Sequence, residues 1–538
     1  MLRKYAASKK CRAEVHLIPK IIVVNHFYLL ANDMKNKNDN QPVPVIETLH
    51  ESHVPQEHQI RIEKVAALKQ LGIDPWPAPK EINTTTTQIV EEYKEDQESR
   101  EYKISGRMVI VRHHGKASFA VLQDSVGRIQ IYLRQDDIGA EQYDLFKRFY
   151  DIGDIVWCSG RSFKTKMGEI TIKVDHLQMM SKCLYPLPEK FHGLTDIETI
   201  YRQRYLDLIS SPESRERFYK RSDVIRAMRD FLDEHGYREV ETPMLHPIPG
   251  GAAAKPFITH HNALGSDFYL RIAPELYLKR LLVGGIERVY EINRNFRNEG
   301  ISTRHNPEFT MLEFYTANQN YLWVMDFVEK MFHTVARKVG ITAQVPYGDT
   351  LLDFDKPFTR IKLFDAVRQY GNLTDADLAE DAIDATLKKH KIVCANKQAS
   401  WSEKVYALFE ELVEHKLIQP TFVTHFPVEV SPLAKRDAQD PRFAARFELF
   451  IAGMEISNAF NELNDPFDQA ERFKQQAKAH AAGDQEAMHY DAEFITALEY
   501  GLPPAVGVGI GIDRLVMLLT NSTSIKDVIL FPTLKKIV

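Results

Sequence analysis

The sequence predicts an α+β protein with two folded domains: a small N-terminal β-barrel, and a larger domain in which helices flank an antiparallel β-sheet. Three observations lead to this prediction. Five short apolar runs separated by glycine turns follow one another between residues 101 and 182, as expected of a small barrel. A polar strand–loop–strand segment at 288–315 and a run of alternating glycines at 507–511 indicate a sheet with one open face.

The composition is that of an ordinary globular protein, since 44% of the 538 residues are hydrophobic and 27% are charged. The net charge of −5 gives no global attraction to a polyanion, so any surface for nucleic acid must be a local patch. The four cysteines lie far apart, which argues against a zinc site or a disulfide framework; they are Cys11, Cys158, Cys183 and Cys394. They fit a reducing compartment, and we expect a cytoplasmic protein.

Residues 1–56 form an N-terminal extension that we expect to be disordered. Residues 1–33 carry six Lys or Arg against two Asp or Glu, and their apolar run, 21–30, is too short to cross a membrane. They are compatible with an organelle transit peptide, with a secretory signal, or with a start of translation at Met34. We favour Met34, because the polar residues that follow it resemble an ordinary N-terminus, and we expect no membrane partner.

Residues 57–100 are predicted to lead into the barrel as a helical segment. A helix over 57–71 is marked by apolar residues and ends at Gly72 and the proline-rich residues 75–79; the markers are Ile60, Ile62, Val65, Leu68 and Leu71. The barrel itself spans 101–182, with strands at 104–112, 117–123, 128–133, 155–163 and 169–177 and a helical insert near 141–149. Five strands with this insert suit an OB-fold barrel, and another kind of small barrel is the alternative.

The larger domain is predicted to span 214–538, after a linker at 183–213 that contains prolines. Its first elements are a long helix at 214–235 and a strand at 238–241, which ends at Pro243 because proline lacks an amide proton. Segments 268–272 and 446–463 are expected to be strands, and 371–425 a helical insertion.

The strand beginning at Arg288 carries a polar face. Under the two-residue strand period, one face presents Glu291, Asn293, Asn295 and Arg297. Burying such groups unpaired is costly, so we expect this face to floor a polar site. On the return strand one face presents an aromatic ring, a carboxylate and a phenol, which suit a small polar ligand with a flat ring; these residues are Phe309, Met311, Glu313 and Tyr315.

This hairpin resembles the second signature motif of the class II aminoacyl-tRNA synthetases, with Phe-Arg-x-Glu at 296–299. The resemblance implies that Arg297 grips the α-phosphate of ATP and the amino-acid carboxylate, that Glu299 and His305 recognise adenine, and that Phe309 stacks on it. An arginine fork matches phosphate and carboxylate and stays charged.

A second segment resembles the third motif of the same family. Glycines alternate at 507, 509 and 511, so that a ligand or backbone can approach the bare strand face, and Arg514 follows at a helix start. The resemblance implies that Arg514 holds the γ-phosphate. The spacing does not match a dinucleotide-binding fingerprint, and the class I synthetase patterns are absent.

The rest of the chain extends the resemblance. The helix, strand and proline at 214–243 resemble the first class II motif, which implies a homodimer. The pattern from Gly115 to Asp124 resembles the anticodon domain of lysine, aspartate and asparagine synthetases. By that resemblance Phe119 stacks an anticodon base, Arg107 stacks or pairs, and Gln130 and Glu169 recognise base edges of tRNA(Lys).

Three residues point to lysine as the amino acid. Glu275 projects from the first turn of a helix, Glu462 shares a strand face with Asn458 and Phe460, and Tyr315 lies on the hairpin. A substrate with two ammonium groups needs separate anionic contacts, whereas aspartate needs a cation.

Residues 200–532 resemble bacterial-type class II lysyl-tRNA synthetases. The match implies that Glu275 and the Gly251 backbone hold the α-amino group, and that Glu462 and Tyr315 hold the ε-ammonium. It also implies that Phe460 walls the methylenes, and that Asn458 and Arg297 hold the carboxylate. The sequence departs from the family at Ala459, where glycine is usual.

Glu448 and Glu455 match the family's Mg²⁺ ligands, and Glu448 is also expected to contact ATP. Their offset of seven puts them on opposite faces of one continuous strand, so we expect a turn at Ala452-Gly453 that makes two strands. Two carboxylates together with ATP oxygens suit Mg²⁺.

The resemblance implies a lysine–tRNA ligase that forms lysyl-adenylate and transfers lysine to the 3′ end of tRNA(Lys). Catalysis would rest on positioning and charge neutralisation by Arg297, Arg514 and Mg²⁺, without a protein nucleophile. One alternative is a ligase that attaches lysine to a protein, but such relatives lack the barrel. The other is a non-catalytic RNA-binding paralogue, which loss of Arg297, Arg514 or Glu448 would favour, and all three are present.

Overall fold

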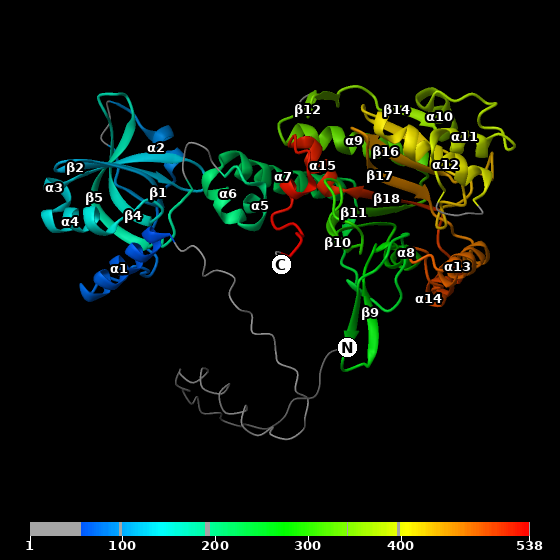
Figure 1. Cartoon of the computed structure of the whole chain (residues 1–538), viewed down its shortest axis with the longest axis horizontal. Coiled ribbons are helices and arrows are strands. Elements are labelled where there is room, and N and C mark those ends of the chain that lie inside the picture. Colours follow the sequence, from blue (N-terminus) through cyan, green and yellow to red (C-terminus); the bar gives the residue numbers. More distant parts are fainter. Residues whose placement is uncertain (1–54, 96–98, 189–193, 342, 395–398, 537–538) are drawn as a thin grey trace, which may run out of the picture. The chain divides into compact units, whose positions relative to one another are not determined.

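The computed structural model describes residues 55–95, 99–188, 194–341, 343–394 and 399–536. Residues 1–54 of the expected extension lie outside this range, and so does Cys11. The chain divides into two compact units, Met1–Pro186 and Leu187–Val538 (Figure 1). Within the described ranges no helix is long and apolar enough to cross a membrane.

The first unit is built on a closed five-stranded barrel, as predicted. The strands run in the order β1-β2-β3-β5-β4, with bounds β1 Tyr102–His114, β2 Ala117–Gln123, β3 Arg128–Arg134, β4 Ile155–Lys164 and β5 Ile170–Ser181. Helices α3 (Gln135–Ile138) and α4 (Ala140–Phe149) stand between β3 and β4, where the helical insert was expected. Inward side chains such as Met108, Leu122 and Ile131 fill the barrel core.

Helices α1 (Gln56–Gln70) and α2 (Thr86–Glu92) both precede the barrel in the chain. The predicted helix is present, but its apolar markers do not all face inward, because Ile60 and Ile62 are exposed while Leu68 is buried. The buried group that ties α1 down is the Arg61 guanidinium, which donates to the carbonyls of Ile152, Cys183 and Tyr185. The apolar pattern of this helix did not predict that Arg61 would anchor it.

The second unit is built on an eight-stranded sheet (Figure 1). In spatial order its strands are β14 Thr359–Lys362, β15 Thr421–Thr424, β16 Arg446–Ile451, β17 Met454–Asn461, β18 Ala505–Gly511, β11 Glu308–Ala317, β10 Arg288–Phe296 and β6 Arg238–Glu239. The strands from β15 to β10 pair antiparallel, as predicted. The edge strands β14 and β6 pair in parallel, so the complete sheet is mixed.

One face of this sheet lies against helices and forms the main core. The helices are α7 Pro212–Glu234, α9 Tyr321–Lys338, α15 Ile512–Leu519 and α16 Ile525–Val528. Phe314, Phe447 and Val508 belong to the core they share with the sheet. This arrangement leaves the alternate residues of the same strands on the opposite face.

The opposite face is covered at its two ends. Near β10 and β11 it packs against α8 Glu275–Val283, α13 Pro466–Ala481 and α14 Ala492–Glu499. Near β15 and β16 it packs against the insertion helices α10 Leu363–Gly371, α11 Ile383–His390 and α12 Trp401–Leu412. The polar pocket described below opens between these two apolar clusters.

The expected linker contains two helices, α5 (Ile197–Arg202) and α6 (Arg204–Ser210). Arg204 is fully buried and donates to the carbonyls of Lys526 and Leu530, so α6 holds the C-terminal segment of the unit.

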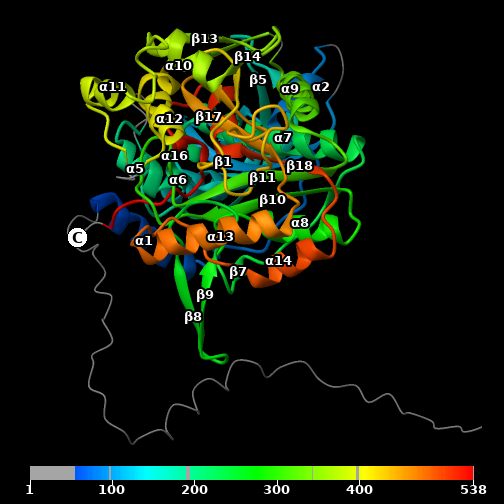
Figure 2. The ribbon, with the colours of Figure 1, turned by 90° about the vertical axis from the view of Figure 1, so that its right-hand side faces the viewer.

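The remaining strands form small sheets. Strands β7 Leu245–His246, β8 Ile258–His261 and β9 Ser266–Leu270 make a three-stranded antiparallel sheet, so the strand expected at 268–272 lies outside the large one. Its β8–β9 hairpin projects from the unit (Figure 2). Strands β12 Gln344–Tyr347 and β13 Thr350–Asp353 form a two-stranded sheet, and η1 (Glu414–Lys416) is a short 3₁₀ turn.

Candidate active site

Cross-strand register places the polar residues of five strands in rows on the open face of the sheet. One row consists of Glu291, Glu313, Gly509, Asn458 and Glu448. The next consists of Val289, Tyr315, Gly507, Phe460 and Arg446. Segments that are far apart in the sequence therefore contribute to one surface.

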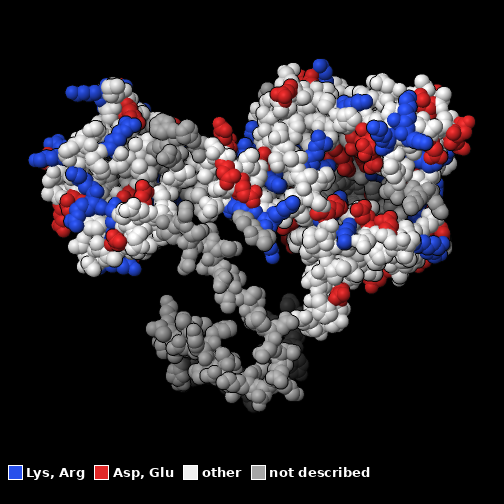
Figure 3. All heavy atoms as spheres, in the orientation of Figure 1, with Lys and Arg blue, Asp and Glu red and all other residues white. Residues whose placement is uncertain are grey.

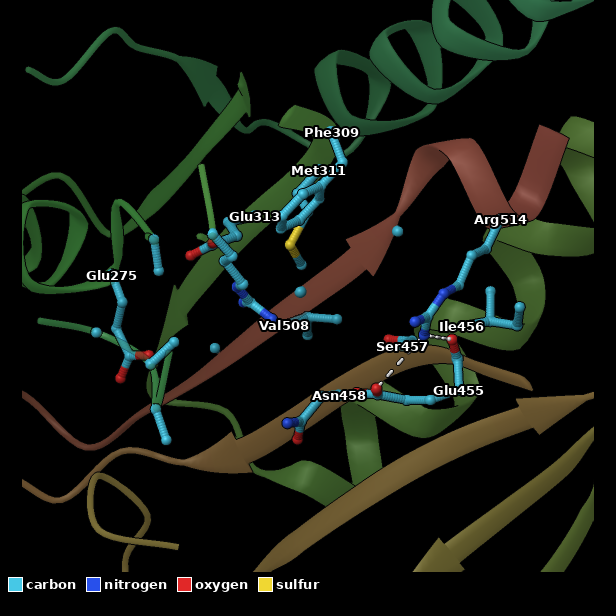
Figure 4. A pocket seen from close by; sticks show the side chains of 18 of the residues that line it. Glu275, Phe309, Met311, Glu313, Glu455, Ile456, Ser457, Asn458, Val508 and Arg514 are labelled. Atoms are coloured by element: carbon cyan, nitrogen blue, oxygen red, sulfur yellow. Dashed lines mark hydrogen bonds and ion pairs between the residues drawn. The ribbon is translucent and has the colours of Figure 1, made fainter. Parts of the chain in front are cut away.

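The rows floor a cavity of about 350 Å³ (Figure 4). Most of the predicted binding residues line it: Gly251, Glu275, Arg297, Glu299, His305, Phe309, Tyr315, Glu455, Asn458, Phe460 and Arg514. Glu448 and Glu462 do not line it, although Glu462 is in contact with groups that do. In Figure 4, Glu275 and Arg514 lie at opposite ends of the cavity.

The strand β10 contributes less of the floor than its polar pattern predicted. Glu291, Asn293 and Asn295 are buried and do not line the cavity. The Glu291 carboxylate accepts from Arg271 at 2.7 Å and from Thr242 at 2.7 Å, so an ion pair rather than a ligand satisfies it. In this part of the hairpin, the residues that line the cavity begin at Arg297, directly after the end of β10.

Arg297 and Arg514 bring positive charge to the cavity. The Arg297 guanidinium lies 5.1 Å from the centre of the Phe309 ring, and its buried Nε has no hydrogen-bond acceptor among the described residues. Arg514 donates through Nη1 to the Glu455 carbonyl at 2.6 Å, and its Nη2 is 3.1 Å from His305 Nε2. A buried unpaired donor calls for a ligand acceptor, and both arginines suit an anion.

The surroundings of the His305 ring favour its neutral form. Burial and then the Arg514 guanidinium lower the pKa of His305 below its usual range. Its Nδ1 is 2.9 Å from the Ser302 hydroxyl. A neutral imidazole can offer a ligand one donor or one acceptor.

The neighbouring Asp513 connects three elements beside this end of the cavity. Its Oδ1 pairs with Arg221 of α7 at 2.6 Å, and its Oδ2 accepts the Thr310 amide proton at 2.7 Å. The start of α15 is thereby fixed to α7 and to the strand that carries Phe309.

Glu448 and Glu455 lie on two antiparallel strands joined at Ala452-Gly453, as predicted. Both turn residues have positive φ, 54° and 67°. A bulge then pairs Glu455 with Phe450 although Ser457 pairs with Leu449, which shifts the face on which Glu455 lies.

The Glu448 carboxylate accepts from Arg446. Burial raises its pKa to about 8 against the effect of Arg446, and Glu455 and Glu414 raise it further. Burial raises the pKa of Glu414 to about 7. Among the described residues, no group of three or more His, Cys, Asp or Glu side chains is arranged to hold a metal ion.

Three buried carboxylates lie at or beside the other end of the cavity: Glu275 and Glu313 line it, and Glu462 pairs with Lys279, which also contacts Glu275. Burial is the main cause that raises the pKa of Glu313 and of Glu462 to about 8. The Tyr315 hydroxyl donates to Glu313 at 3.4 Å, and burial raises its pKa well above the usual range. Such a surplus of carboxylates favours a cationic ligand.

Lys279 is the residue that sequence reasoning missed here. Its fully buried ammonium donates to Glu275 at 2.5 Å and pairs with Glu462. The four-residue spacing of Glu275 and Lys279 on one helix was an available signal for the first contact. No local pattern announced the second, because Glu462 is far away in the sequence.

Two side chains lie close against the bare face at Gly507. A Cβ on Gly507 would lie 2.2 Å from Glu462 Oε1 and 2.3 Å from Tyr315 Cε1. At Gly509 the nearest atom is the flexible methyl end of Met311, at 3.0 Å. The glycine at 507 therefore makes room for two predicted binding groups.

On the barrel, register puts Arg107, Phe119 and Gln130 on the outward faces of neighbouring strands. The Phe119 ring is 4.9 Å from Tyr132, whose ring is 6.0 Å from Phe163, so the aromatic row is longer than predicted. Arg107 donates to the Gly153 carbonyl, Gln130 donates to Thr171, and Glu169 is exposed in the β4–β5 turn.

Exposed basic residues lie around this outer surface, among them Arg112, Lys116 and Arg128. Lys and Arg side chains stand out at several places on the first unit, interspersed with Asp and Glu (Figure 3).

Comparison with known proteins places both units. Residues 196–535 match the family described as tRNA synthetases class II (D, K and N), and residues 102–180 match the OB-fold nucleic acid binding domain. A lysine–tRNA ligase of Carboxydothermus hydrogenoformans is 53% identical, over 89% of this chain and 97% of that protein. Those of Pelotomaculum thermopropionicum and Salmonella typhi are 54% and 52% identical, over 89% of this chain and 94% and 96% of theirs.

We expect Gly507→Ala to destabilise the protein by about 1–3 kcal/mol, because the new Cβ must displace Glu462 and Tyr315 from a close-packed interior. Gly509→Ala is the matched control on the same strand and should cost less, since only the end of Met311 has to move. Urea denaturation followed by circular dichroism measures both. Equal losses would show that the contacts at Gly507 relax freely.

Proposed function

The chain belongs to the class II tRNA synthetases of the aspartate, lysine and asparagine group and acts as a lysine–tRNA ligase; we propose that the cavity described above is where lysine meets ATP. The observation that carries this assignment is the surplus of buried carboxylates at Glu275, Glu313 and Glu462. Lysine brings two ammonium groups to balance them. Aspartate would add negative charge, and asparagine would compensate only through its α-amino group.

In this proposal the amino acid lies at the carboxylate end of the cavity. Glu275 and the backbone of Gly251 hold the α-amino group, and Glu462 and Tyr315 hold the ε-ammonium. Phe460 walls the methylenes. The geometry is favourable because Glu275, Gly251, Tyr315 and Phe460 all line the cavity and Glu462 lies in contact with this group.

The substrate carboxylate would lie between Arg297 and Asn458, both of which line the cavity. The unpaired Nε of Arg297 supports this role, since an anionic ligand would satisfy it. Asn458 Oδ1 already accepts from Arg446 at 3.1 Å, which leaves its amide protons to donate to a carboxylate.

ATP would occupy the end that contains the second arginine. Arg514 and Arg297 offer guanidinium groups to phosphate oxygens, Glu299 and His305 recognise adenine, and Phe309 stacks on it. The ring of Phe309 already stands beside the Arg297 guanidinium, which would put base and phosphate contacts within one hairpin.

The first step joins the two substrates without a protein nucleophile. The lysine carboxylate oxygen attacks the α-phosphorus, an anhydride bond forms, and pyrophosphate leaves. Arg297 aligns both reacting groups, and Arg514 neutralises charge on the leaving phosphates. In the second step a hydroxyl of the terminal ribose of tRNA(Lys) attacks the activated carbonyl and AMP leaves.

We propose Glu448 and Glu455 as the protein ligands of Mg²⁺, which when bound would neutralise phosphate charge. The raised pKa of Glu448 supports an unmet need for positive charge, although Arg446 already supplies part of it. A spectroscopic titration with Mn²⁺ of the wild type and Glu448→Gln, in the presence of ATP, tests this ligand set.

The outer aromatic row of the barrel is the proposed anticodon surface. Phe119 offers a stacking face, and Arg107, Gln130 and Glu169 offer polar contacts, but Arg107 and Gln130 must share their existing hydrogen bonds.

Free thiols at Cys158, Cys183 and Cys394 support a cytoplasmic location. We also propose a homodimer through α7, on which Tyr219 is exposed, and a mass measurement in solution decides this.

Lysine should be activated in preference to aspartate and asparagine in ATP–pyrophosphate exchange with the purified full chain. Glu462→Gln should raise the KM for lysine by a factor that corresponds to about 1–3 kcal/mol of lost binding free energy, because the buried ammonium of lysine then keeps only a neutral partner. Glu493→Gln, at an exposed carboxylate of α14, is the control and should change little. Faster exchange with either rival amino acid would refute the assignment.

Phe119→Ala should weaken charging of tRNA(Lys) while exchange without tRNA stays near normal. Losing one stacked base should cost about 1–3 kcal/mol of tRNA binding, far from the ATP site along the tRNA. Val126→Ala removes another exposed apolar side chain of the same unit and should affect neither reaction. If exchange falls together with charging for Phe119→Ala, the ring serves folding instead.

A further inference from the structure

The ammonium of Lys279 is enclosed by groups from several elements. Its contacts are Glu275 on its own helix α8 and Glu462 directly after β17. The rings of Phe460 and Phe494 lie 5.4 Å and 6.0 Å from it. The side chain is wholly removed from solvent, so the ammonium is available only to these neighbours.

Further charged groups surround the cluster formed by Lys279, Glu275 and Glu462. Strand β11 adds the Glu313 carboxylate and the Tyr315 hydroxyl, and both are affected by Glu275. Among the cations, Arg446 of β16 lowers the pKa of Glu275, and Arg297 and Arg271 lower the pKa of Glu313. The Glu291 carboxylate raises the pKa of Glu313. The Lys279 ammonium therefore pairs with two carboxylates, Glu275 and Glu462, and a third carboxylate, Glu313, lies close enough to interact with both of them.

A purely structural role does not account for this arrangement. A buried ion pair adds little net stability over apolar side chains of similar size. Here the ammonium instead links Glu275, which lines the same cavity as Arg297, to Glu462, which does not line it. The ammonium offsets part of their charge while leaving room for a second cation.

Resting on the proposed function, we propose that Lys279 is a positioning residue that makes the site selective for an amino acid with two ammonium groups. It bridges Glu275 and Glu462, fixes where each carboxylate stands, and favours the ionised form of both against the effect of burial while the cavity holds no amino acid. Fewer protons then have to leave when lysine binds than would have to leave without the ammonium.

Removal of the Lys279 ammonium would change the protonation of the neighbouring carboxyl groups. Without it, the pKa of Glu275 and of Glu462 would rise further, and these carboxyl groups would hold more protons at neutral pH than they do beside the ammonium. Lysine would have to displace those protons in order to bind. Binding would therefore weaken as pH falls and recover as pH rises through the raised carboxyl pKa.

The test compares Lys279→Met with Arg280→Met, which removes the next cation of the same helix and leaves the cavity untouched. In pyrophosphate exchange, Lys279→Met should raise the KM for lysine about tenfold or more at about pH 7, and clearly less at about pH 9, with kcat changed far less. Arg280→Met should follow the wild type at both pH values.

Calorimetry of lysine binding in two buffers of different ionisation enthalpy adds a direct count of protons. Lys279→Met should release more protons per lysine bound than the wild type. Wild-type proton release together with a wild-type pH profile of KM would overturn the proposal. If the wild type itself prefers aspartate or asparagine, it is the proposed function that fails.

Should Lys279→Met not fold, Lys279→Gln and Lys279→Arg replace it. The glutamine keeps hydrogen-bonding capacity without charge and should show the shifted pH profile, whereas the arginine keeps the charge and should show less of it. Identical profiles for these two variants would mean that the charge at this position has no part in lysine selection.

Discussion

The antiparallel register of the strands from β15 to β10 decides what every other part of the second unit can do. Side chains alternate between the two faces of each strand. The strands that bury Phe314, Phe447 and Val508 against helices therefore present Glu313, Asn458 and Gly509 on the opposite face. A shift of one residue in any central strand would turn polar groups into the core. Stability of the sheet and assembly of the cavity are consequently one constraint.

On that floor the cavity is divided by charge. In the proposed function, Arg297 and Arg514 supply positive groups for phosphate and carboxylate, and the carboxylates near Glu275 supply negative groups for ammonium. Each end of the cavity would then attract one substrate and repel the other, so that the two substrates are oriented before any chemistry begins. The buried neighbours of each group, Arg446 for Glu448 and Lys279 for Glu462, determine how much of that charge remains for a ligand.

Sequence patterns predicted the parts that depend on local rules. The strand runs of the barrel, the helical insert near α4 and the turn at Ala452-Gly453 follow from periodicity, glycine and the separation of two glutamates. Family resemblance supplied the roles of the cavity residues. The parallel edge strands, the bulge before Glu455 and the contact of Lys279 with Glu462 were not predictable in this way, because they depend on pairings between distant segments. The burial of Asn293 and Asn295 was missed for a related reason, since a polar strand face does not reveal what covers it.

The absence of a side chain at position 507 also limits how this site can change over generations. Every residue other than glycine carries a Cβ, and that atom would meet Glu462 and Tyr315 at little more than 2 Å. No single replacement there can retune the cavity gradually, since the smallest available step already collides with two of its walls. Drift toward a different amino acid would have to begin at Glu462 or Tyr315 themselves, with Gly507 free to vary only after one of them had become smaller.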